Sequence, residues 1–179
     1  KLAKYYEATR ELSRQLSEWS KDLNEEDQKY VVCSGGGPGI MKAANRGASE
    51  AEAKSVSLGI SLPFENEPNP YVPPELNFEF HYFFTRKFWF SYLAEAFVIM
   101  PGGFGTLDEF FEILTLIQTG KINKDLPIVL FGEDYWKSLI NFETLVDYGV
   151  IDKKDLDLFY ITSSVESAFE HITSKLKLK

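Results

Sequence analysis

The sequence predicts an α/β fold in which helices cover both faces of a doubly wound, mostly parallel sheet. Three observations support this prediction: short apolar runs alternate with amphipathic segments, glycine-rich turns follow two of the runs, and 179 residues suit one domain. Strands that alternate with helices form right-handed crossovers, which bury a parallel sheet on both faces. We therefore expect a single domain over residues 1–179.

The first half of the chain opens on an amphipathic helix, because apolar residues recur every three to four positions between residues 2 and 23. The elements expected after it are a strand over 30–33, a helix over 40–53, strands over 55–62 and 78–81, and a helix over 86–95. Residues 63–74 are rich in proline and are expected to form a surface loop near the site.

The second half continues the alternation without a repeat, a low-complexity segment or a domain linker. Its expected elements are strands over 96–100, 127–131 and 158–161, and helices from Thr106 to about 119, from Asp134 and from Ser164. The chain begins on a helix and without Met, so we expect a preceding strand to be absent from this sequence. Its absence would leave a sheet edge or gap that something must cover.

Composition and charge exclude several classes of protein. The chain is 44% hydrophobic and 26% charged, which is typical of globular domains and not of fibrous or disordered chains. Lys and Arg number 19 against 27 Asp and Glu, so the net charge is −8. Because this charge repels phosphodiester backbones and anionic lipids, we expect neither nucleic acid nor a membrane as a partner.

Cysteine and histidine are too few for a disulfide framework or a metal cluster. Cys33 is the only cysteine, which indicates a reducing, cytoplasmic setting. His81 and His171 lie far apart and outside any zinc-binding spacing, so structural roles are favoured and no metal site is expected. The longest apolar runs are also far shorter than the roughly 20 residues of a membrane span.

Topology brings three segments to one edge of the predicted sheet. Ligands of doubly wound sheets bind beyond the carboxyl ends of the strands, where turns expose N–H groups and helices begin. The first glycine turn (residues 35–39), residues 82–86 and the second glycine turn (residues 101–106) all follow predicted strands. The two turns and Arg86 are therefore expected to converge.

The second glycine turn supports two interpretations. Gly102, Gly103 and Gly105 would let the backbone approach an anion, and Thr106 would open the helix with a hydroxyl, as in a phosphate cradle. Alternatively, Thr106 and Glu109 form a capping box that satisfies the helix end alone. The two interpretations are compatible, since a capped helix end would hold Glu109 rigidly.

The first glycine turn does not match a dinucleotide-binding fingerprint. From Gly35 or Gly37, the sixth position of GxGxxG is Ile40 or Lys42, so NAD binding is disfavoured. The structural alternative is a turn that clears space under the sheet edge.

Arg86 and Lys87 place positive charge on the same rim in an otherwise acidic chain. The alternative for this pair is two solvated cations on a helix surface. Nine aromatic residues surround the pair, more than one short helix can hide within a single chain. A subunit interface is therefore expected, with core packing or base stacking as alternatives for one or two rings. The nine are Phe78, Phe80, Tyr82, Phe83, Phe84, Phe88, Trp89, Phe90 and Tyr92.

Three segments carry a resemblance to a known family. Residues 33–41 (CSGGGPGIM), 84–87 (FTRK) and 101–109 (PGGFGTLDE) resemble the Lonely Guy (LOG) family, and the similarity extends from Tyr5 to Lys121. Residues 43–47 and 114–119 are similar to its longer-chain branch. Members are Rossmann-like phosphoribohydrolases of nucleoside 5′-monophosphates that release cytokinins, and many were once labelled lysine decarboxylases. In this family a strand with a Gly-Ser-rich turn precedes the opening helix.

The resemblance implies a site at matching positions. Arg86 and Glu109 match the catalytic pair, whereas Glu65 and Thr115 are weaker matches to binding positions. Together with the first glycine turn, the substrate-binding candidates are Gly35, Gly36, Gly37, Glu65, Lys87, Gly102, Gly103, Phe104, Gly105, Thr106, Leu107, Asp108 and Thr115.

The function expected from this resemblance is hydrolysis of a purine nucleoside 5′-monophosphate, AMP or a cytokinin nucleotide, to base and ribose 5-phosphate. Glu109 would stabilise the oxocarbenium-like ribose and activate water, and Arg86 would hold the phosphate or polarise the departing base. No cofactor or metal is required, and a homodimer or higher homo-oligomer is expected. The alternatives are a non-catalytic nucleotide or cofactor carrier and, without support beyond the old label, a pyridoxal-phosphate-dependent lysine decarboxylase.

Overall fold

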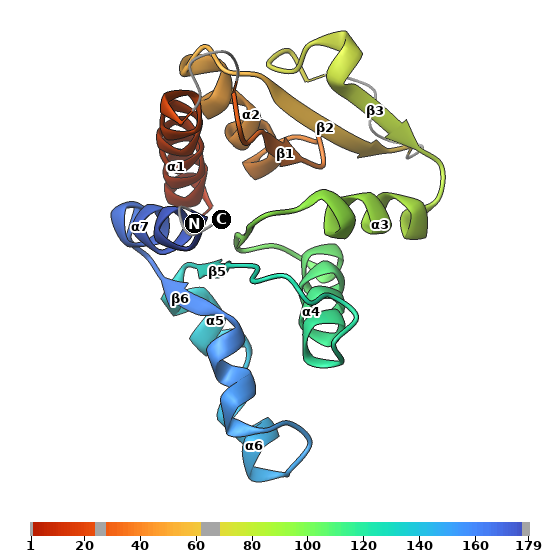
Figure 1. Cartoon of the computed structure of the whole chain (residues 1–179), viewed down its shortest axis with the longest axis vertical. Coiled ribbons are helices and arrows are strands. Elements are labelled where there is room, and N and C mark those ends of the chain that lie inside the picture. Colours follow the sequence, from red (N-terminus) through yellow and green to blue (C-terminus); the bar gives the residue numbers. More distant parts are fainter. Residues whose placement is uncertain (1, 24–27, 62–68, 177–179) are drawn as a thin grey trace. The chain divides into compact units, whose positions relative to one another are not determined.

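The computed structural model of the chain describes residues 2–23, 28–61 and 69–176 and divides into two compact units. The N-terminal unit is Lys1–Leu93 and the C-terminal unit is Ala94–Lys179. Each unit alternates strands with helices around a three-stranded parallel sheet (Figure 1). The predicted α/β class and parallel strand pairing are confirmed. The expectation of a single domain over residues 1–179 stays a prediction.

The N-terminal unit has a sheet in the order β1-β2-β3. The register places Ser34 of β1 opposite Ser57 of β2, and β1 lies at an edge of the sheet. Its elements are α1 (Ala3–Asp22), β1 (Val32–Ser34), α2 (Ile40–Glu50), β2 (Ser55–Ile60), η1 (Pro74–Leu76), β3 (Asn77–Phe80) and α3 (Phe83–Leu93).

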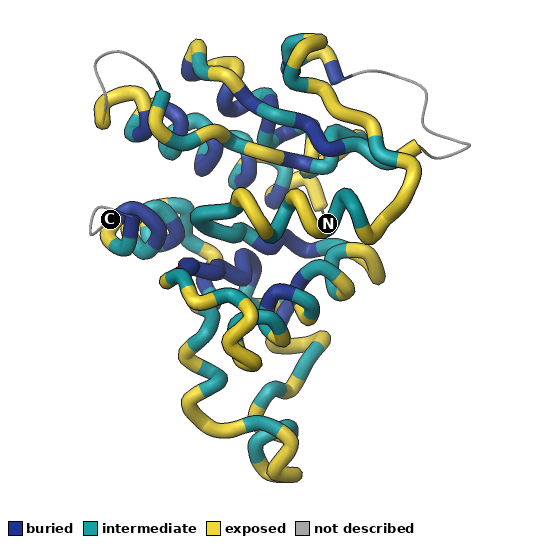
Figure 2. Tube along the Cα trace, turned by 45° about the vertical axis from the view of Figure 1, so that its right-hand side comes forward, coloured by how far each residue is buried: buried dark blue, intermediate teal, exposed yellow. Residues whose placement is uncertain are grey.

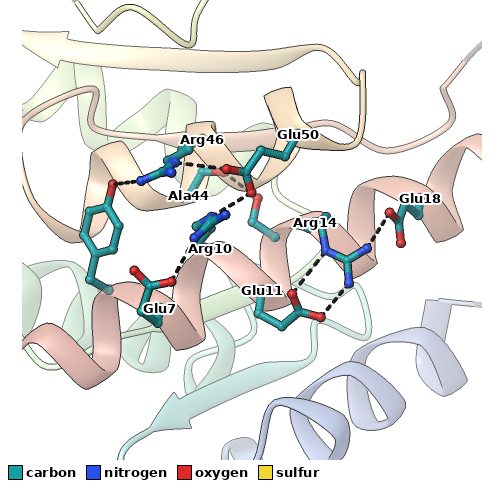
Figure 3. Close-up of polar contacts among 10 residues, drawn as sticks. Glu7, Arg10, Glu11, Arg14, Glu18, Ala44, Arg46 and Glu50 are labelled. Atoms are coloured by element: carbon teal, nitrogen blue, oxygen red, sulfur yellow. Dashed lines mark hydrogen bonds and ion pairs between the residues drawn. The ribbon is translucent and has the colours of Figure 1, made fainter.

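Helices α1 and α2 approach each other closely because a glycine lies at their contact. A Cβ atom on Gly47 would overlap the backbone oxygen of Arg10. Beside this contact, Arg10 pairs with Glu50 at 2.7 Å and Arg46 pairs with the same carboxylate at 3.0 Å (Figure 3). Partly exposed ion pairs contribute little to stability. The close approach of the two helices therefore requires glycine at position 47, whereas the ion pairs add little to it.

The C-terminal unit has a sheet in the order β4-β5-β6, with β4 at an edge. Its elements are β4 (Phe97–Ile99), α4 (Phe104–Gln118), β5 (Ile128–Phe131), α5 (Glu133–Leu139), α6 (Phe142–Asp147), η2 (Lys153–Leu158), β6 (Tyr160–Thr162) and α7 (Val165–Leu176).

The core of the C-terminal unit is built around β5, in which all four residues are buried (Figure 2). Phe110 and Trp136 are fully buried beside it, with ring centroids 5.6 Å apart. The indole N–H of Trp136 donates to the backbone oxygen of Phe131 at 3.0 Å, which satisfies the one polar atom of that side chain. This core supports the end of β4 and the start of α4, between which the second glycine turn lies.

Two helices begin earlier than the sequence predicts. Helix α3 begins at Phe83 rather than near Arg86, and α4 begins at Phe104, with Gly103 as its N-cap, rather than at Thr106. Both starts lack an N-cap side chain that would mark them in the sequence. The segments α6 and η2 were not predicted, because six residues are too few to reveal a helical period. Within the described ranges, no helix combines the length and apolar character that a membrane span requires.

Candidate functional site

The first glycine turn joins β1 to α2 and contains two residues in the left-handed region. Gly36 has φ of +74° and Gly39 has φ of +70°, a conformation that residues with a Cβ rarely adopt. A Cβ atom on Gly36 would also overlap the hydroxyl of Ser57. Glycine is thus required at position 36 by both backbone conformation and packing.

The peptide of Gly36 is held from within the unit. Its N–H donates to the hydroxyl oxygen of Ser34 at 3.0 Å, so this donor is used inside the turn. Gly39 is the N-cap of α2 and has no side chain to cap the helix. The helix α2 therefore begins at the turn with its positive dipole end next to the glycine backbone.

Arg86 lies beside this turn. Its Nη1 atom is 3.6 Å from the position that a Cβ on Gly35 would occupy. On α3 its guanidinium lies 5.6 Å from the ring centroids of both Phe83 and Phe90. Aromatic rings close to a guanidinium stabilise and orient it. Lys87, the next residue on α3, is half-buried.

These features make the first glycine turn suitable for an anion. A fixed guanidinium, a helix N-terminus and a glycine backbone without side chains are the usual components of a phosphate site. All three belong to the N-terminal unit, so the structure confirms that Arg86 and the first glycine turn lie together.

The second glycine turn follows β4 and leads into α4. A Cβ on Gly102 would overlap the side chain of Thr106, which packs over it. At Gly103 and Gly105, in contrast, a Cβ would meet no atom within 4 Å. Phe104, between them, is 92% exposed. The open side of the turn therefore has room for a ligand and an aromatic ring next to it.

A residue that the sequence did not indicate holds this turn. The phenol of Tyr135, on α5, donates a 2.5 Å hydrogen bond to the backbone oxygen of Gly102. The two residues are 33 positions apart, so no local sequence signal marks the contact. Tyr135 fixes the carbonyl at the base of the turn.

The capping box expected at Thr106 and Glu109 does not occur, because Gly103 is the N-cap of α4. Thr106 is the third residue of the helix and covers Gly102 instead. Glu109 is half-buried on the same helix.

The remaining candidates on α4 differ in their surroundings. Leu107 is partly buried and packs against the core cluster of the C-terminal unit, whereas Asp108 is exposed. The hydroxyl of Thr115 donates to the backbone oxygen of Phe111 at 2.7 Å, on an exposed part of the helix.

The candidates are thus divided between two units. Arg86, Lys87 and the first glycine turn belong to the N-terminal unit, and Glu109 and the second glycine turn belong to the C-terminal unit. Glu65 lies outside the described residues. Among the described residues, no three His, Cys, Asp or Glu side chains gather as a metal site.

Comparison with known proteins gives a family and a fold. The family model described as "Possible lysine decarboxylase" matches residues 41–172. Cytokinin riboside 5′-monophosphate phosphoribohydrolase LOG7 of Arabidopsis thaliana is 35% identical over 103 residues, which are 51% of this chain and 46% of that protein. Pyrimidine/purine nucleotide 5′-monophosphate nucleosidase of Escherichia coli K12 is 31% identical over 130 residues, 62% of this chain and 27% of that protein. The chain thus spans about half the length of the first relative and about a quarter of the second.

A solved structure shares the fold. The X-ray structure of TM1055 matches with a TM-score of 0.66 at 22% identity, over 97% of this chain and 90% of that one. The Rossmann-like α/β fold expected from the sequence is thereby confirmed.

Proposed function

Because this chain belongs to the family described as possible lysine decarboxylases, which includes the LOG proteins, we propose that it hydrolyses the N-glycosidic bond of nucleoside 5′-monophosphates. The products would be the free base and ribose 5-phosphate. A purine substrate, AMP or a cytokinin nucleotide, is part of this proposal. The activities for which the two relatives are named, a phosphoribohydrolase and a nucleosidase, support the reaction class.

The observation that carries the proposal is the position of Arg86. Its guanidinium lies near two aromatic rings and beside Gly35, at the glycine turn where α2 begins. A nucleoside 5′-monophosphate carries a dianionic phosphate that suits such a site. In a protein with a net charge of −8, a fixed cation at a glycine turn supports selective binding of an anion.

The proposed reaction needs a carboxylate beside the sugar. As the C1′–N bond breaks, positive charge develops on the ribose and the electron pair leaves with the base. Glu109 would stabilise this charge and accept a proton from the water whose oxygen bonds to C1′. The departing base takes up a proton, so the net change is addition of water across the broken bond. Arg86 would bind the phosphate or polarise the departing base.

The open side of the second glycine turn is assigned to the same substrate. Gly103 and Gly105 leave room at the N-terminus of α4, a 15-residue helix whose dipole favours an anion. Gly37, Lys87, Leu107, Asp108 and Thr115 remain proposed binding positions on the strength of the family resemblance. Glu65 is proposed on the same ground.

The test is incubation of the full chain with AMP and measurement of adenine by chromatography. We expect Glu109→Ala to lower adenine release by about 10²- to 10⁴-fold, which is the usual contribution of an acid–base group. The matched control is Glu112→Ala, also on α4, which should leave release within about twofold. Equal release from wild type and Glu109→Ala would contradict the proposal.

The same assay distinguishes the rival functions. A carrier would bind AMP tightly without releasing adenine, and binding would persist in Glu109→Ala. A lysine decarboxylase would show the visible absorption band of bound pyridoxal phosphate and would release carbon dioxide from lysine. Either result, without adenine release by the wild type, would overturn the hydrolase proposal.

We also infer that the chain forms a homodimer or a higher homo-oligomer through α3. This helix has no buried residue, and Figure 2 shows none of it in dark blue. Its large side chains include Phe84 at 70% exposure and Tyr92 at 63%. Clusters of exposed aromatic side chains are typical of protein interfaces. Light scattering at micromolar concentration should give a multiple of the monomer mass, and a monomer mass would contradict the inference.

A cytoplasmic location is proposed from the single cysteine of the chain. Cell fractionation of the source organism tests this point.

A further inference from the structure

We propose that Asn45 is a positioning residue that fixes the first glycine turn through the hydroxyl of Ser34. The inference rests on the proposed function, since it assigns the turn to substrate binding. Asn45 lies on α2 and is 0% exposed, so it touches no substrate itself. Its effect on the turn passes through hydrogen bonds that are entirely inside the N-terminal unit.

The amide of Asn45 has one orientation because all of its hydrogen-bonding positions are used. A side-chain amide accepts two hydrogen bonds on its oxygen and donates two from its nitrogen. Oδ1 accepts from the hydroxyl of Ser34 at 2.6 Å and from the side-chain nitrogen of Asn69 at 2.9 Å. Nδ2 donates to the hydroxyl of Ser55 at 3.0 Å and to the backbone oxygen of Val56 at 3.3 Å. A buried network in which every member is satisfied is rigid.

Ser34 passes this orientation to the turn. A serine hydroxyl has one proton, and the hydroxyl of Ser34 uses it to donate a hydrogen bond to Oδ1 of Asn45. The lone pairs of the same oxygen then accept the N–H of Gly36 at 3.0 Å. Without the oxygen of Asn45, the hydroxyl of Ser34 would rotate and present its proton in other directions. Asn45 therefore fixes the orientation of the hydroxyl, so that its lone pairs face the N–H of Gly36.

The turn has little freedom once Gly36 is held. Gly36 is in the left-handed region, and its Cα lies against the buried side chain of Ser57 on the neighbouring strand. Gly35, the preceding residue, is the one that lies beside the guanidinium of Arg86. A shift of Gly36 would thus move the backbone that faces Arg86. The geometry links the buried amide to the proposed phosphate site through three consecutive contacts.

The same oxygen of Asn45 also holds the segment that precedes η1. Asn69 is buried, donates to Asn45 and accepts the backbone N–H of Tyr71 at 3.1 Å. Asn45 therefore orders the first glycine turn and residues 69–71 together.

The experiment compares two serines that bond to the same amide. Asn45→Ala would remove four buried hydrogen bonds at once and is expected to unfold the chain, so the neighbours are changed instead. Ser34 and Ser55 are both buried on strands and both bond to Asn45, but only Ser34 contacts the turn. Ser34→Ala and Ser55→Ala are made in the full chain, and KM and kcat for AMP are measured for each.

We expect Ser34→Ala to raise KM for AMP about tenfold with a smaller change in kcat, because the turn is displaced from its binding geometry. Ser55→Ala should leave KM within about twofold, although it removes a comparable buried hydrogen bond. If the network had only a structural role, both variants would lose stability. KM for AMP would then either stay unchanged in both or rise equally in both. Either of those results would overturn the proposal.

A second measurement separates this inference from the hydrolase proposal. Hydrogen exchange of the Gly36 amide, followed by NMR, should become at least about tenfold faster in Ser34→Ala than in Ser55→Ala. If the wild type releases no adenine from AMP, the hydrolase proposal fails, and this exchange measurement alone decides whether the hydroxyl of Ser34, through which Asn45 acts, holds the turn. Equal exchange in the two variants would contradict the role of Ser34.

Discussion

The two glycine turns are alike in sequence but differ in which of their glycines the folded backbone needs. In the first turn, Gly36 and Gly39 have positive φ, and Gly36 is packed against Ser57. In the second turn, Gly103 has φ of −92°, and a Cβ at Gly103 or Gly105 would meet no atom within 4 Å. The first turn needs glycine at position 36 to fold. In the second turn packing against Thr106 requires glycine at position 102, whereas positions 103 and 105 would accept a side chain in the folded chain.

A run of glycines in a sequence does not by itself show whether the backbone requires glycine or whether the missing side chains leave space for a ligand. Where the backbone conformation demands glycine, the residue reports on the fold. Where neither conformation nor packing demands it, the missing side chain leaves space that a ligand can use. The supports differ as well: a buried amide holds the first turn, and the phenol of Tyr135 holds the second.

The largest expected effect is on folding of the first turn. Gly36→Ala places a Cβ in a left-handed conformation and against Ser57, and each effect costs about 1–3 kcal/mol. The free energy of unfolding, measured by urea denaturation, should fall by at least about 2 kcal/mol. Gly103→Ala, the matched control, should change it by less than about 0.5 kcal/mol. Similar losses in both variants would refute the contrast between the turns.

A smaller effect is expected on ligand binding at the second turn. Gly103→Ala fills the open side with a methyl group while leaving the fold intact. KM for AMP should rise about tenfold, which corresponds to about 1.4 kcal/mol of binding free energy. An unchanged KM would show that the open side of this turn does not face the substrate.

The hydrogen bond of Tyr135 gives the third prediction. Tyr135→Phe keeps the ring but removes the bond to Gly102, so the free energy of unfolding should fall by about 1 kcal/mol. Because the turn loses its anchor, kcat/KM for AMP should also fall several-fold. Tyr148→Phe is the control, since Tyr148 is 82% exposed. If both variants behave like the wild type, Tyr135 does not hold the turn.

The smallest expected effect concerns the ion pair between helices α1 and α2. A hydrogen bond from Arg10 is the main cause that lowers the pKa of the Glu50 carboxyl from its ordinary value. A carboxyl with a lowered pKa stabilises the fold above its unfolded pKa, and this contribution disappears as pH falls through the folded pKa. Glu50→Gln should therefore lower the free energy of unfolding slightly at pH 7. The difference from wild type should vanish as pH falls from about 5 to about 3.

That pH dependence is measured by urea unfolding across the acidic range. A destabilisation by Glu50→Gln that stays constant down to about pH 3 would show that the ion pair with Arg10 is not its cause.

Most elements of the fold were predictable because their periodicity is local. The helix expected over residues 2–23 is α1, and the strand expected over 127–131 is β5. The starts of α3 and α4 were placed too late, since glycine and aromatic residues at helix starts give no capping signal. The division of the strands between two three-stranded sheets depends on tertiary pairing, which periodicity does not report.

The candidate site was predictable in its residue types but not in its supports. Topology and family resemblance together indicated Arg86 and the first glycine turn, and these lie together. Tyr135 and the roles of Ser34 and Asn69 were missed because their hydrogen bonds join residues that are distant in sequence or buried. Such contacts become visible only when strands and helices are placed in three dimensions.

The most direct test of the proposed hydrolase is a crystal structure of the Glu109→Gln variant with AMP bound. The isosteric change should slow hydrolysis enough to retain the substrate. We expect the side chain at position 109 to lie within about 3–4 Å of the anomeric carbon or of a water beside it, and Arg86 to contact the nucleotide. A side chain at position 109 that points away from the ribose, or AMP bound remote from Arg86, would contradict the proposal.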